Sequence, residues 1–428
     1  MQIFNRNRTF LAAFLAIAVS FFSACGSKPP ESNSAGVTAL SQVPAVRLNY
    51  RYEADVPVPT LPGVTIEERN AAVQADFDTN RTQEQLDRTI TSPDKKRVLA
   101  VYRNVTDLTS EVRLDMYTPE GKLLRKVTAD TMAVHFPDTI IWSPDSSSVA
   151  FVAMLRTLTP LAPSTTPATA SSTTPLSAEP ASPVEPTPQA AATPAAPTGV
   201  LTFRTEQIYI CNADGAGIKS LTQNEGLIYF YYVWSPDSTM LAALATTERE
   251  WRYLTVLAEQ KGEVMVPLGR PRVVEKNGRE RRLDDNLTAV HPVWSPDSAK
   301  VAAAFETQIR IYDAGGVNPT QAAIPLKNQL LISSQAYDRQ QQQIAANSTD
   351  PNAAPSASPA EPLTTLPDEK LLVSYNPIVE LGWTSEDLLY AKTAYLKRMK
   401  LETENVTSFA RWHRLVFSAQ PLTPVANK

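Results

Sequence analysis

The stretch WSPDS occurs three times in this chain, at residues 142–146, 234–238 and 294–298. Each copy lies between two short runs of β-branched and aromatic residues, which is typical of two paired strands joined by a turn. In Ser-Pro-Asp the proline fixes φ for a type I turn, and the serine and aspartate side chains accept hydrogen bonds from nearby backbone N–H groups. Weaker copies at residues 92–94 and 383–387 lack the tryptophan and the proline, respectively. We call this stretch the corner and expect it to mark a repeated structural unit.

The corner tryptophans indicate packing between units rather than ligand binding. Four of the six tryptophans in the chain occupy this one place in the repeat. A large ring at the end of a strand covers apolar surface between neighbouring units, whereas a ligand contact has no reason to recur so regularly. The residues assigned to the corners are Trp142, Pro144, Asp145, Trp234, Pro236, Asp237, Trp294, Pro296, Asp297 and Trp383.

A second pair of strands follows several of the corners. Residues 205–223 are the clearest case, since Asp214 and Gly215 form an Asp-Gly hairpin signal between two alternating runs. Residues 111–128 and 308–326 have the same pattern. Each unit is therefore expected to hold four antiparallel strands in about 45 to 60 residues, which is the size of a propeller blade.

These two turns, in this order, resemble the repeat of the TolB-like β-propeller family, whose blades carry a Trp-Ser-Pro-Asp corner and a later Ala-Asp-Gly turn. The resemblance covers residues 88 to 417 and implies an all-β fold, a β-propeller of four-stranded antiparallel blades. The sequence departs from the family at Ser146, Ser238 and Ser298, where glycine is usual and a left-handed backbone suits serine less well. Five blades are recognisable. Residues 45–56 are expected to supply either a closing strand or part of a sixth.

The N-terminus is read as a bacterial lipoprotein signal. Residues 1–24 combine a basic start with an apolar run of the length that an export signal needs, and residues 22–25, FSAC, resemble a lipobox in which Cys25 is acylated. Residues 25–43 are rich in Ser, Pro and Asn and are expected to be a flexible tether, followed by the propeller over residues 44–428. This predicts a lipid-anchored protein of the cell envelope that faces the periplasm or the exterior. Gly26 in place of aspartate favours the outer membrane.

Three segments interrupt the repeat. Residues 158–199 and 335–368 are rich in Pro, Ala, Ser, Thr or Gln, and we expect both to be disordered insertions because they cannot bury enough apolar surface. The third is a basic stretch interpreted as a loop between two units, with a solvated charge run as the simpler reading. It is a candidate contact for a polyanion through Arg270, Arg272, Arg279, Arg281 and Arg282. We infer that all three lie on the edge opposite the corners.

Residues for catalysis are hard to find. The chain has three histidines, His135, His291 and His413, each beside a corner or in an alternating strand, and it contains none of the common metal or nucleophile motifs. The strands before the corners read TIIW, YFYYVW, HPVW and VELGW, which we interpret as largely apolar. We therefore predict no catalytic residue, no metal site and no cofactor. The net charge of −4 gives no global attraction to nucleic acid.

The function expected from these features is that of a non-enzymatic, membrane-anchored scaffold that binds other envelope proteins. Two alternatives stay open. The first is a propeller enzyme, a hydrolase or lyase, that acts on a glycan or peptide in the central channel; a pocket there with two carboxylates, or with a histidine and a carboxylate, would favour it. The second is a module that binds cell-wall glycan in an aromatic groove. The sequence leaves open the partner, any small-molecule ligand and the oligomeric state.

Overall fold

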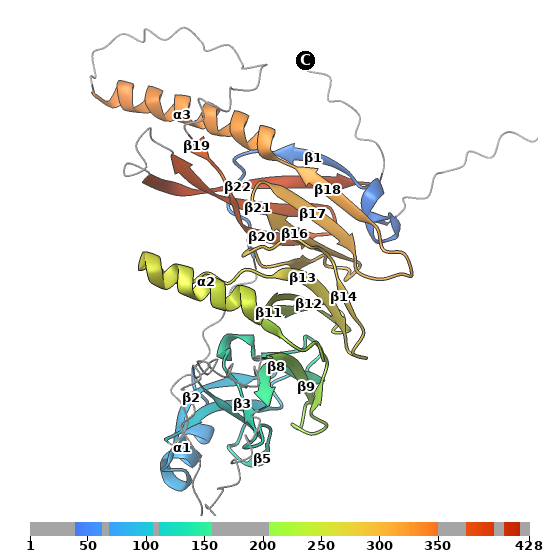
Figure 1. Ribbon diagram of the computed structural model, residues 1–428, viewed down its shortest axis with the longest axis vertical. Coiled ribbons are helices and arrows are strands. Elements are labelled where there is room, and N and C mark those ends of the chain that lie inside the picture. The colour runs from blue at the N-terminus through green and yellow to red at the C-terminus, as the bar shows by residue number, and fades with distance from the viewer. Residues whose placement is uncertain are drawn as a thin grey trace, which may run out of the picture. The chain divides into compact units, whose positions relative to one another are not determined.

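The computed structural model describes residues 39–61, 68–105, 111–155, 205–349, 374–397 and 406–419. Strands are the main regular structure among these residues, and helices are few (Figure 1). The helices are α1 (Ala71–Asn80), α2 (Glu248–Lys261) and α3 (Lys327–Thr349), with short 3-10 turns η1 (Leu40–Gln42), η2 (Ala45–Arg47) and η3 (Pro137–Thr139). None of the helices in the described ranges has the length and apolar character needed to cross a membrane. The predicted signal peptide, Cys25 and the insertion at 158–199 all lie outside the described residues.

The described strands form five antiparallel sheets, which we number I to V in chain order. Sheet I holds β2 (Glu84–Thr91), β3 (Val98–Asn104), β4 (Arg113–Tyr117) and β5 (Leu123–Lys126). Sheet II holds β6 (Met132–Ala133), β7 (Ile141–Trp142), β8 (Ser148–Leu155), β9 (Gln207–Asn212) and β10 (Lys219–Ser220). Sheet III holds β11 (Leu227–Trp234), β12 (Met240–Thr247), β13 (Arg270–Glu275) and β14 (Glu280–Arg282). Sheet IV holds β15 (Val293–Trp294), β16 (Lys300–Phe305), β17 (Gln308–Asp313) and β18 (Gln321–Pro325).

Sheet V joins the two ends of the described chain. It holds β19 (Ser374–Tyr375), β20 (Ile378–Ser385), β21 (Leu388–Lys397) and β22 (Val406–Ser418), and β1 (Asn49–Glu53) pairs antiparallel with β22. Among residues 45–56 the structure therefore has a single strand, which extends sheet V. The predicted tether ends too late, because Leu40 packs against a core cluster and Val43 is buried. That correction applies only to residues 39–43, the part of the tether that the structure describes.

Each corner is a tight turn held by its own side chains. At the corner of sheet II, the Ser143 hydroxyl donates to Asp145 Oδ1 over 2.5 Å, and the backbone N–H of Ser147 donates to the same oxygen over 3.0 Å. The backbone N–H of Ser148 donates to Ser143 Oγ over 3.0 Å. The corners of sheets I, III and IV repeat the bond from serine to aspartate at 2.5 to 2.7 Å. The carboxylates of the corner aspartates therefore accept hydrogen bonds within the turn and stabilise it.

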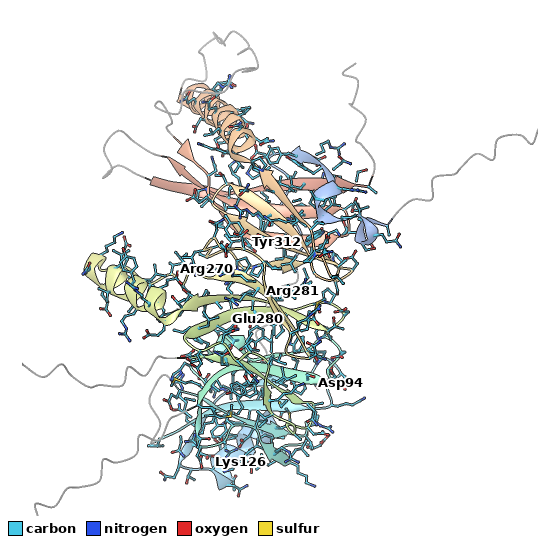
Figure 2. The ribbon with its side chains drawn as sticks, turned by 45° about the vertical axis from the view of Figure 1, so that its right-hand side comes forward. Asp94, Lys126, Arg270, Glu280, Arg281 and Tyr312 are labelled. Carbon is cyan, nitrogen blue, oxygen red and sulfur yellow. The ribbon has the colours of Figure 1, made fainter. Side chains whose placement is uncertain are left out.

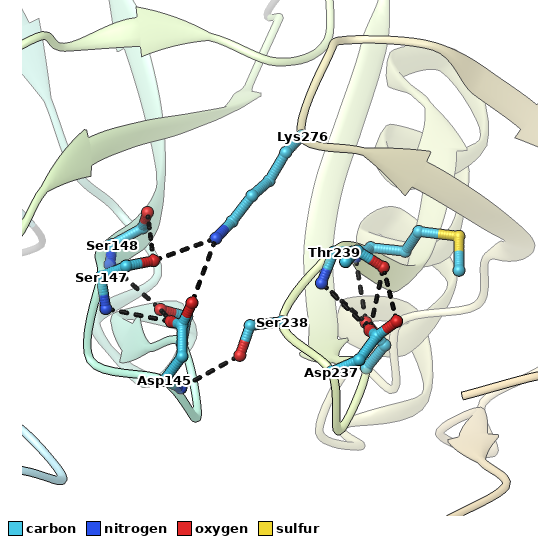
Figure 3. A network of polar contacts seen from close by, with 10 residues as sticks. Asp145, Ser147, Ser148, Asp237, Ser238, Thr239 and Lys276 are labelled. Carbon is cyan, nitrogen blue, oxygen red and sulfur yellow. Dashed lines mark hydrogen bonds and ion pairs between the residues drawn. The ribbon is translucent and has the colours of Figure 1, made fainter. Parts of the chain in front are cut away.

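The serines that follow the corner aspartates adopt the left-handed backbone and also connect the sheets. Ser146, Ser238 and Ser298 have φ of 61°, 62° and 61°. Ser238 Oγ accepts a hydrogen bond of 3.0 Å from the backbone N–H of Asp145, in the corner of the preceding sheet (Figure 3). Ser146 accepts one from Asp94, and Ser298 one from Asp237, both also at 3.0 Å. A left-handed conformation costs a residue with a Cβ roughly 1–2 kcal/mol, and a hydrogen bond that glycine cannot make offsets about 1 kcal/mol of it.

The apolar cores lie between consecutive sheets. Trp142 is buried with Leu99 and Met116 of sheet I and with Phe151 of its own sheet. Trp234 lies in the corresponding cluster of sheets II and III, and Trp294 in that of sheets III and IV. Each ring removes apolar surface from water, which is the main source of stability in such a stack of sheets.

The basic stretch is not a loop between units, and that prediction is wrong. It forms β13 and β14, the third and fourth strands of sheet III. The two strands are joined at Asn277 and Gly278, where Gly278 has φ of 92° and its N–H donates to the carbonyl of Glu275 over 2.8 Å. An Asn-Gly pair between alternating residues is a hairpin signal that the high charge of the stretch obscured.

The predicted disorder from residue 335 onward is also wrong for the residues described. α3 runs from Lys327 to Thr349 and buries Leu330 and Leu331. This stretch contains no proline and is rich in glutamine, alanine and leucine, which favour helix. The composition of the whole tract suggested disorder because its prolines lie further on, in the part from residue 350 that falls outside the described chain.

Candidate active site

The strands before the corners of sheets III and V, β11 and β20, each contain a bulge that turns a polar side chain out of the core. In β11 the pairing with β12 shifts between Tyr229 and Tyr231, so Tyr229 and Tyr232 both point into the core between sheets II and III. In β20 the same shift lies between Ile378 and Glu380. A bulge inserts one residue and reverses which face the following side chains occupy. Tyr231 and Glu380 are therefore directed away from the cores.

These two side chains face a pocket of about 430 Å³, a size suited to a small ligand or a short segment of a polymer. The first strands of three consecutive sheets form its walls. The lining residues are Leu61, Tyr231, Val233, Ala289, His291, Val293, Trp294, Val379, Glu380, Leu381, Gly382 and Trp383.

His291 and Tyr231 form a face-to-face pair in this pocket. Their ring centroids are 3.6 Å apart and the rings lie within 8° of parallel. The His291 side chain is open to solvent on its other side. Partial burial against the tyrosine lowers the pKa of His291, and the nearby charge of Glu380 opposes this effect. Burial raises the pKa of Tyr231 to about 12. At neutral pH the pair therefore offers an unprotonated imidazole beside a protonated phenol.

Glu380 adds the one carboxylate among the residues that line the pocket. Its Oε2 accepts a hydrogen bond of 2.8 Å from Lys392 Nζ on the adjacent strand β21. The ammonium group also lies 5.6 Å from the ring centroid of Trp412. The carboxylate of Glu380 is consequently paired with the ammonium group of Lys392.

Two of the corner tryptophans complete the pocket. Trp294 donates its indole N–H to the carbonyl of Val233 over 3.1 Å, which fixes the ring against the wall formed by sheet III. Trp383 is half-buried and packs at 5.8 Å from Phe417. With Tyr231 they give the pocket three aromatic side chains.

The other assigned corner residues are not among the lining residues of this pocket. The prediction that no residue could serve in catalysis classed the strings YFYYVW, HPVW and VELGW as largely apolar and so passed over Tyr231, His291 and Glu380 within them. The signal was present in the sequence, because each of the three stands three positions before a corner tryptophan. The mean apolar character of these strands concealed it.

The remaining histidines lie in buried surroundings. His135 has Nδ1 3.3 Å from Glu206 and Nε2 3.6 Å from Glu111. The two glutamates are 0% and 5% exposed, so a substrate does not reach them. His413 Nδ1 lies 2.8 Å from the Tyr52 hydroxyl, and the residue is 1% exposed. Within the described residues, no group of three or more His, Cys, Asp or Glu side chains is arranged to hold a metal ion.

The candidate polyanion contact is largely neutralised by internal ion pairs. Arg270 binds Glu250 through two hydrogen bonds of 2.7 and 2.8 Å, and Arg272 lies 2.6 Å from Glu280. Figure 2 labels Arg270, Glu280 and Arg281 on this part of the ribbon. Two further pairs are Arg279 with Glu275 at 2.5 Å and Arg282 with Asp285 at 2.8 Å. Arg281 is partly buried, which lowers its pKa, and it donates to the carbonyl of Ala314. A polyanion contact at these arginines stays a prediction, as does acylation of Cys25.

Cys211 is a buried core residue rather than a reactive thiol. It is 2% exposed in the cluster between sheets I and II, and burial raises its pKa to about 12. A thiol needs a low pKa and access to solvent to act as a nucleophile.

No protein-family model and no curated protein sequence matches the chain. Among solved structures, an oligogalacturonate lyase from Vibrio parahaemolyticus matches at 11% identity and a TM-score of 0.30, with 56% of this chain and 54% of that chain covered. An oligogalacturonate lyase in complex with manganese matches at 10% identity and a TM-score of 0.33, over 77% and 64% of the two chains. Prolyl oligopeptidase B from Galerina marginata matches at 9% identity and a TM-score of 0.36, over 78% and 36%.

The prediction of a non-enzymatic protein-binding scaffold is corrected by these findings. The pocket has the histidine and the carboxylate that the sequence analysis set as the mark of the enzyme alternative, and the structures named above are two lyases and a peptidase. The chain spans about a third to two thirds of the length of those proteins. It is a mainly β protein.

Proposed function

We propose that this chain is an enzyme that cleaves a glycan in the pocket by acid–base chemistry. The observation that carries the proposal is the stacked pair of an unprotonated His291 and a protonated Tyr231 in a pocket that the half-buried Trp383 also lines. A general base must be unprotonated at the working pH and is most effective when its pKa lies near that pH. Aromatic rings present flat apolar surfaces on which sugar rings can stack.

The composition of the pocket favours elimination over hydrolysis. No Ser, Thr or Cys is among its lining residues in the described chain, so the nucleophile that most peptidases use is missing. Hydrolysis of a glycoside by the usual route needs two carboxylates, and the lining contains one. Elimination needs a base and a proton donor, and His291 and Tyr231 supply these two groups.

In the proposed step, His291 removes the proton from the carbon next to a uronate carboxylate. The electron pair of that bond forms a carbon–carbon double bond, and the bond from the β carbon to the linking oxygen breaks. Tyr231 donates its proton to the leaving oxygen. Lys392 donates to Glu380 and so balances the charge of that carboxylate, which would otherwise repel the carboxylates of the substrate.

We also propose that the five sheets are blades of a propeller and that the pocket is part of its central channel. The first strands line the pocket, and β1 completes the last sheet, as expected for a ring that joins its two ends. Lipid attachment at Cys25 would place this enzyme at the cell envelope, close to polymers of the cell surface.

The test compares the wild-type protein with His291→Asn and Tyr231→Phe on polygalacturonate, alginate and hyaluronan, with amylose as a neutral polymer. Elimination produces a conjugated double bond that absorbs in the ultraviolet. We expect each variant to lose roughly 10²-fold or more of the rate while its melting temperature is preserved. The matched control is Tyr253→Phe, since Tyr253 is 66% exposed on α2 and away from the pocket. Full activity in His291→Asn would reject the proposal.

A further inference from the structure

The third residue before each corner tryptophan, which we call the pre-corner position, has a different character from the corner itself. It is Thr139 in sheet II, Tyr231 in sheet III, His291 in sheet IV and Glu380 in sheet V. In sheet I, where Thr91 stands in place of the tryptophan, it is Arg88. The corner repeats the same residue types from unit to unit, whereas the pre-corner position holds five different polar residues. Residues that recur in every unit serve the packing that all units share. A position whose residue type changes from unit to unit is instead suited to contacts that differ between units, such as those with a ligand.

Contacts between neighbouring sheets connect the chain segments that carry the pre-corner residues, and we call this series of residues the pre-corner line. The Arg88 guanidinium donates to the carbonyl of Pro137 and to Asp138, directly before Thr139. The carbonyl of Thr139 accepts a hydrogen bond from the hydroxyl of Tyr232, the neighbour of Tyr231.

Two further interactions of this line lie in the pocket. Tyr231 stacks on His291, and the charge of Glu380 acts on His291 from the next sheet. Thr139 is the exception within the line, because its hydroxyl donates to the carbonyl of Phe136 and accepts from the backbone N–H of Val152.

Arg88 is the cation of this line, and it can exchange its partner. A bulge between Leu86 and Arg88 turns its side chain out of the core, as in β11 and β20. The side chain is 36% exposed, and the Asp138 carboxylate that it meets at 3.2 Å is 93% exposed. An ion pair this open to solvent contributes about 0–1 kcal/mol, so the carboxylate of a ligand can replace Asp138 at little cost. Arginine binds carboxylates with two parallel hydrogen bonds when the geometry permits.

We infer that the pre-corner positions form a line of subsites for one extended acidic glycan, in which Arg88 binds a uronate carboxylate away from the cleaved linkage. The inference rests on the proposed function and adds to it a requirement for chain length and charge. A short fragment fills only the pocket with Tyr231, His291 and Glu380. A longer one reaches Arg88 as well.

The experiment measures kcat/KM on uronate oligomers of increasing length for wild type, Arg88→Gln and Arg88→Lys. We expect kcat/KM of the wild type to rise with length, and Arg88→Gln to lose roughly 10- to 100-fold on the longest oligomers but little on the shortest. Arg88→Lys, which keeps the charge without the paired hydrogen bonds, should fall in between. The matched control is Arg97→Gln, because Arg97 is 32% exposed, pairs with the exposed Asp214 at 2.7 Å and lies beside the corner of the same sheet.

A second measurement separates this inference from the proposed function. Binding of the longest oligomer to wild type and to Arg88→Gln is followed by the fluorescence of the pocket tryptophans. Absence of turnover in the wild type rejects the proposed elimination, and the ratio of the two dissociation constants then still tests the subsite. Equal kcat/KM at every length together with equal dissociation constants in the two proteins would overturn the role of Arg88.

Discussion

The corner and the pre-corner position lie three residues apart on the same strands, and they use the repeat in opposite ways. At the corner, serine, aspartate and a following serine recur, and each makes the same hydrogen bond in sheet after sheet. At the pre-corner position the residue changes in every sheet. Identical corner residues suit a stack of equivalent interfaces, because the packing at each interface is the same. Difference is what a ligand requires, because each of its groups needs its own partner.

This contrast implies that stability and activity are separable along one strand. A substitution at the corner should lower the free energy of unfolding and leave the chemistry of the folded protein unchanged. A substitution at the pre-corner positions of the pocket should do the reverse, because His291 and Tyr231 face solvent or each other rather than a core. Unfolding measurements on corner variants test the first expectation, and activity measurements on the His291 and Arg88 variants test the second.

The largest expected effect concerns the two neutral histidines His291 and His413. Burial and the charge of Arg411 lower the pKa of His413 to about 4, and Asp55 opposes them. The unfolded chain, with an ordinary histidine pKa near 6.5, then binds this proton more readily than the folded one. The free energy of unfolding should therefore fall by about 3 kcal/mol as the pH drops from about 6.5 to about 4, and level off below that.

Urea denaturation across this pH range compares wild type with His413→Gln, which removes the titrating group. We expect the pH dependence of the variant to be shallower by that amount. His291→Asn is the control, since its pKa is lowered less and its ring is accessible. Parallel pH profiles for wild type and His413→Gln would contradict the assignment.

The corner can be predicted from the sequence, whereas the pocket cannot, and the reasons are physical. The turn of Ser143, Pro144 and Asp145 depends on residues within a few positions, so its chemistry can be read locally. The bond between Asp145 and Ser238 joins positions 93 residues apart, and only the folded order of the sheets brings them together. The pocket depends on bulges at Tyr231 and Glu380, and a bulge leaves no clear mark in an alternating pattern.

The helices were missed for a different reason. α2 begins with a capping box at Thr247 and Glu250, a local signal that could have been read from the sequence. α3 starts within residues that precede the tract classed as disordered, and its burial of Leu330 depends on contacts with a core cluster formed by distant strands. Composition averaged over a long window hid α3.

A smaller effect is expected from the left-handed corner residue. Ser238→Ala keeps the strained backbone and removes the bond to the N–H of Asp145, so it should cost about 1–2 kcal/mol. Ser238→Gly relieves the strain as it loses the bond, so its cost should be smaller. Lys95 has φ of 59° at the same place in sheet I, the first sheet in the order, and Lys95→Gly should stabilise the protein by about 1 kcal/mol.

Chemical denaturation of the three variants gives this ranking directly. If Ser238→Ala and Ser238→Gly were equally stable, the left-handed backbone would carry no cost at this corner. If Ser238→Gly were more stable than wild type, the strain of the left-handed backbone would outweigh the hydrogen bond between the sheets. Lys95→Gly serves as the internal standard for the strain alone.

The smallest expected effect separates two tryptophans that look equivalent in sequence. Trp142 donates its indole N–H to the carbonyl of Ile90 over 3.1 Å, whereas the indole N–H of Trp234 has no hydrogen-bond partner among the described residues. Both rings are buried, at 8% and 5% exposure. Phenylalanine removes a similar apolar area at each site, so the loss of packing should be alike. Trp142→Phe also leaves a buried carbonyl without its donor, and we expect it to cost about 1 kcal/mol more than Trp234→Phe. Equal costs, measured by urea denaturation at the same pH, would mean that ring burial alone determines what the corner tryptophan contributes.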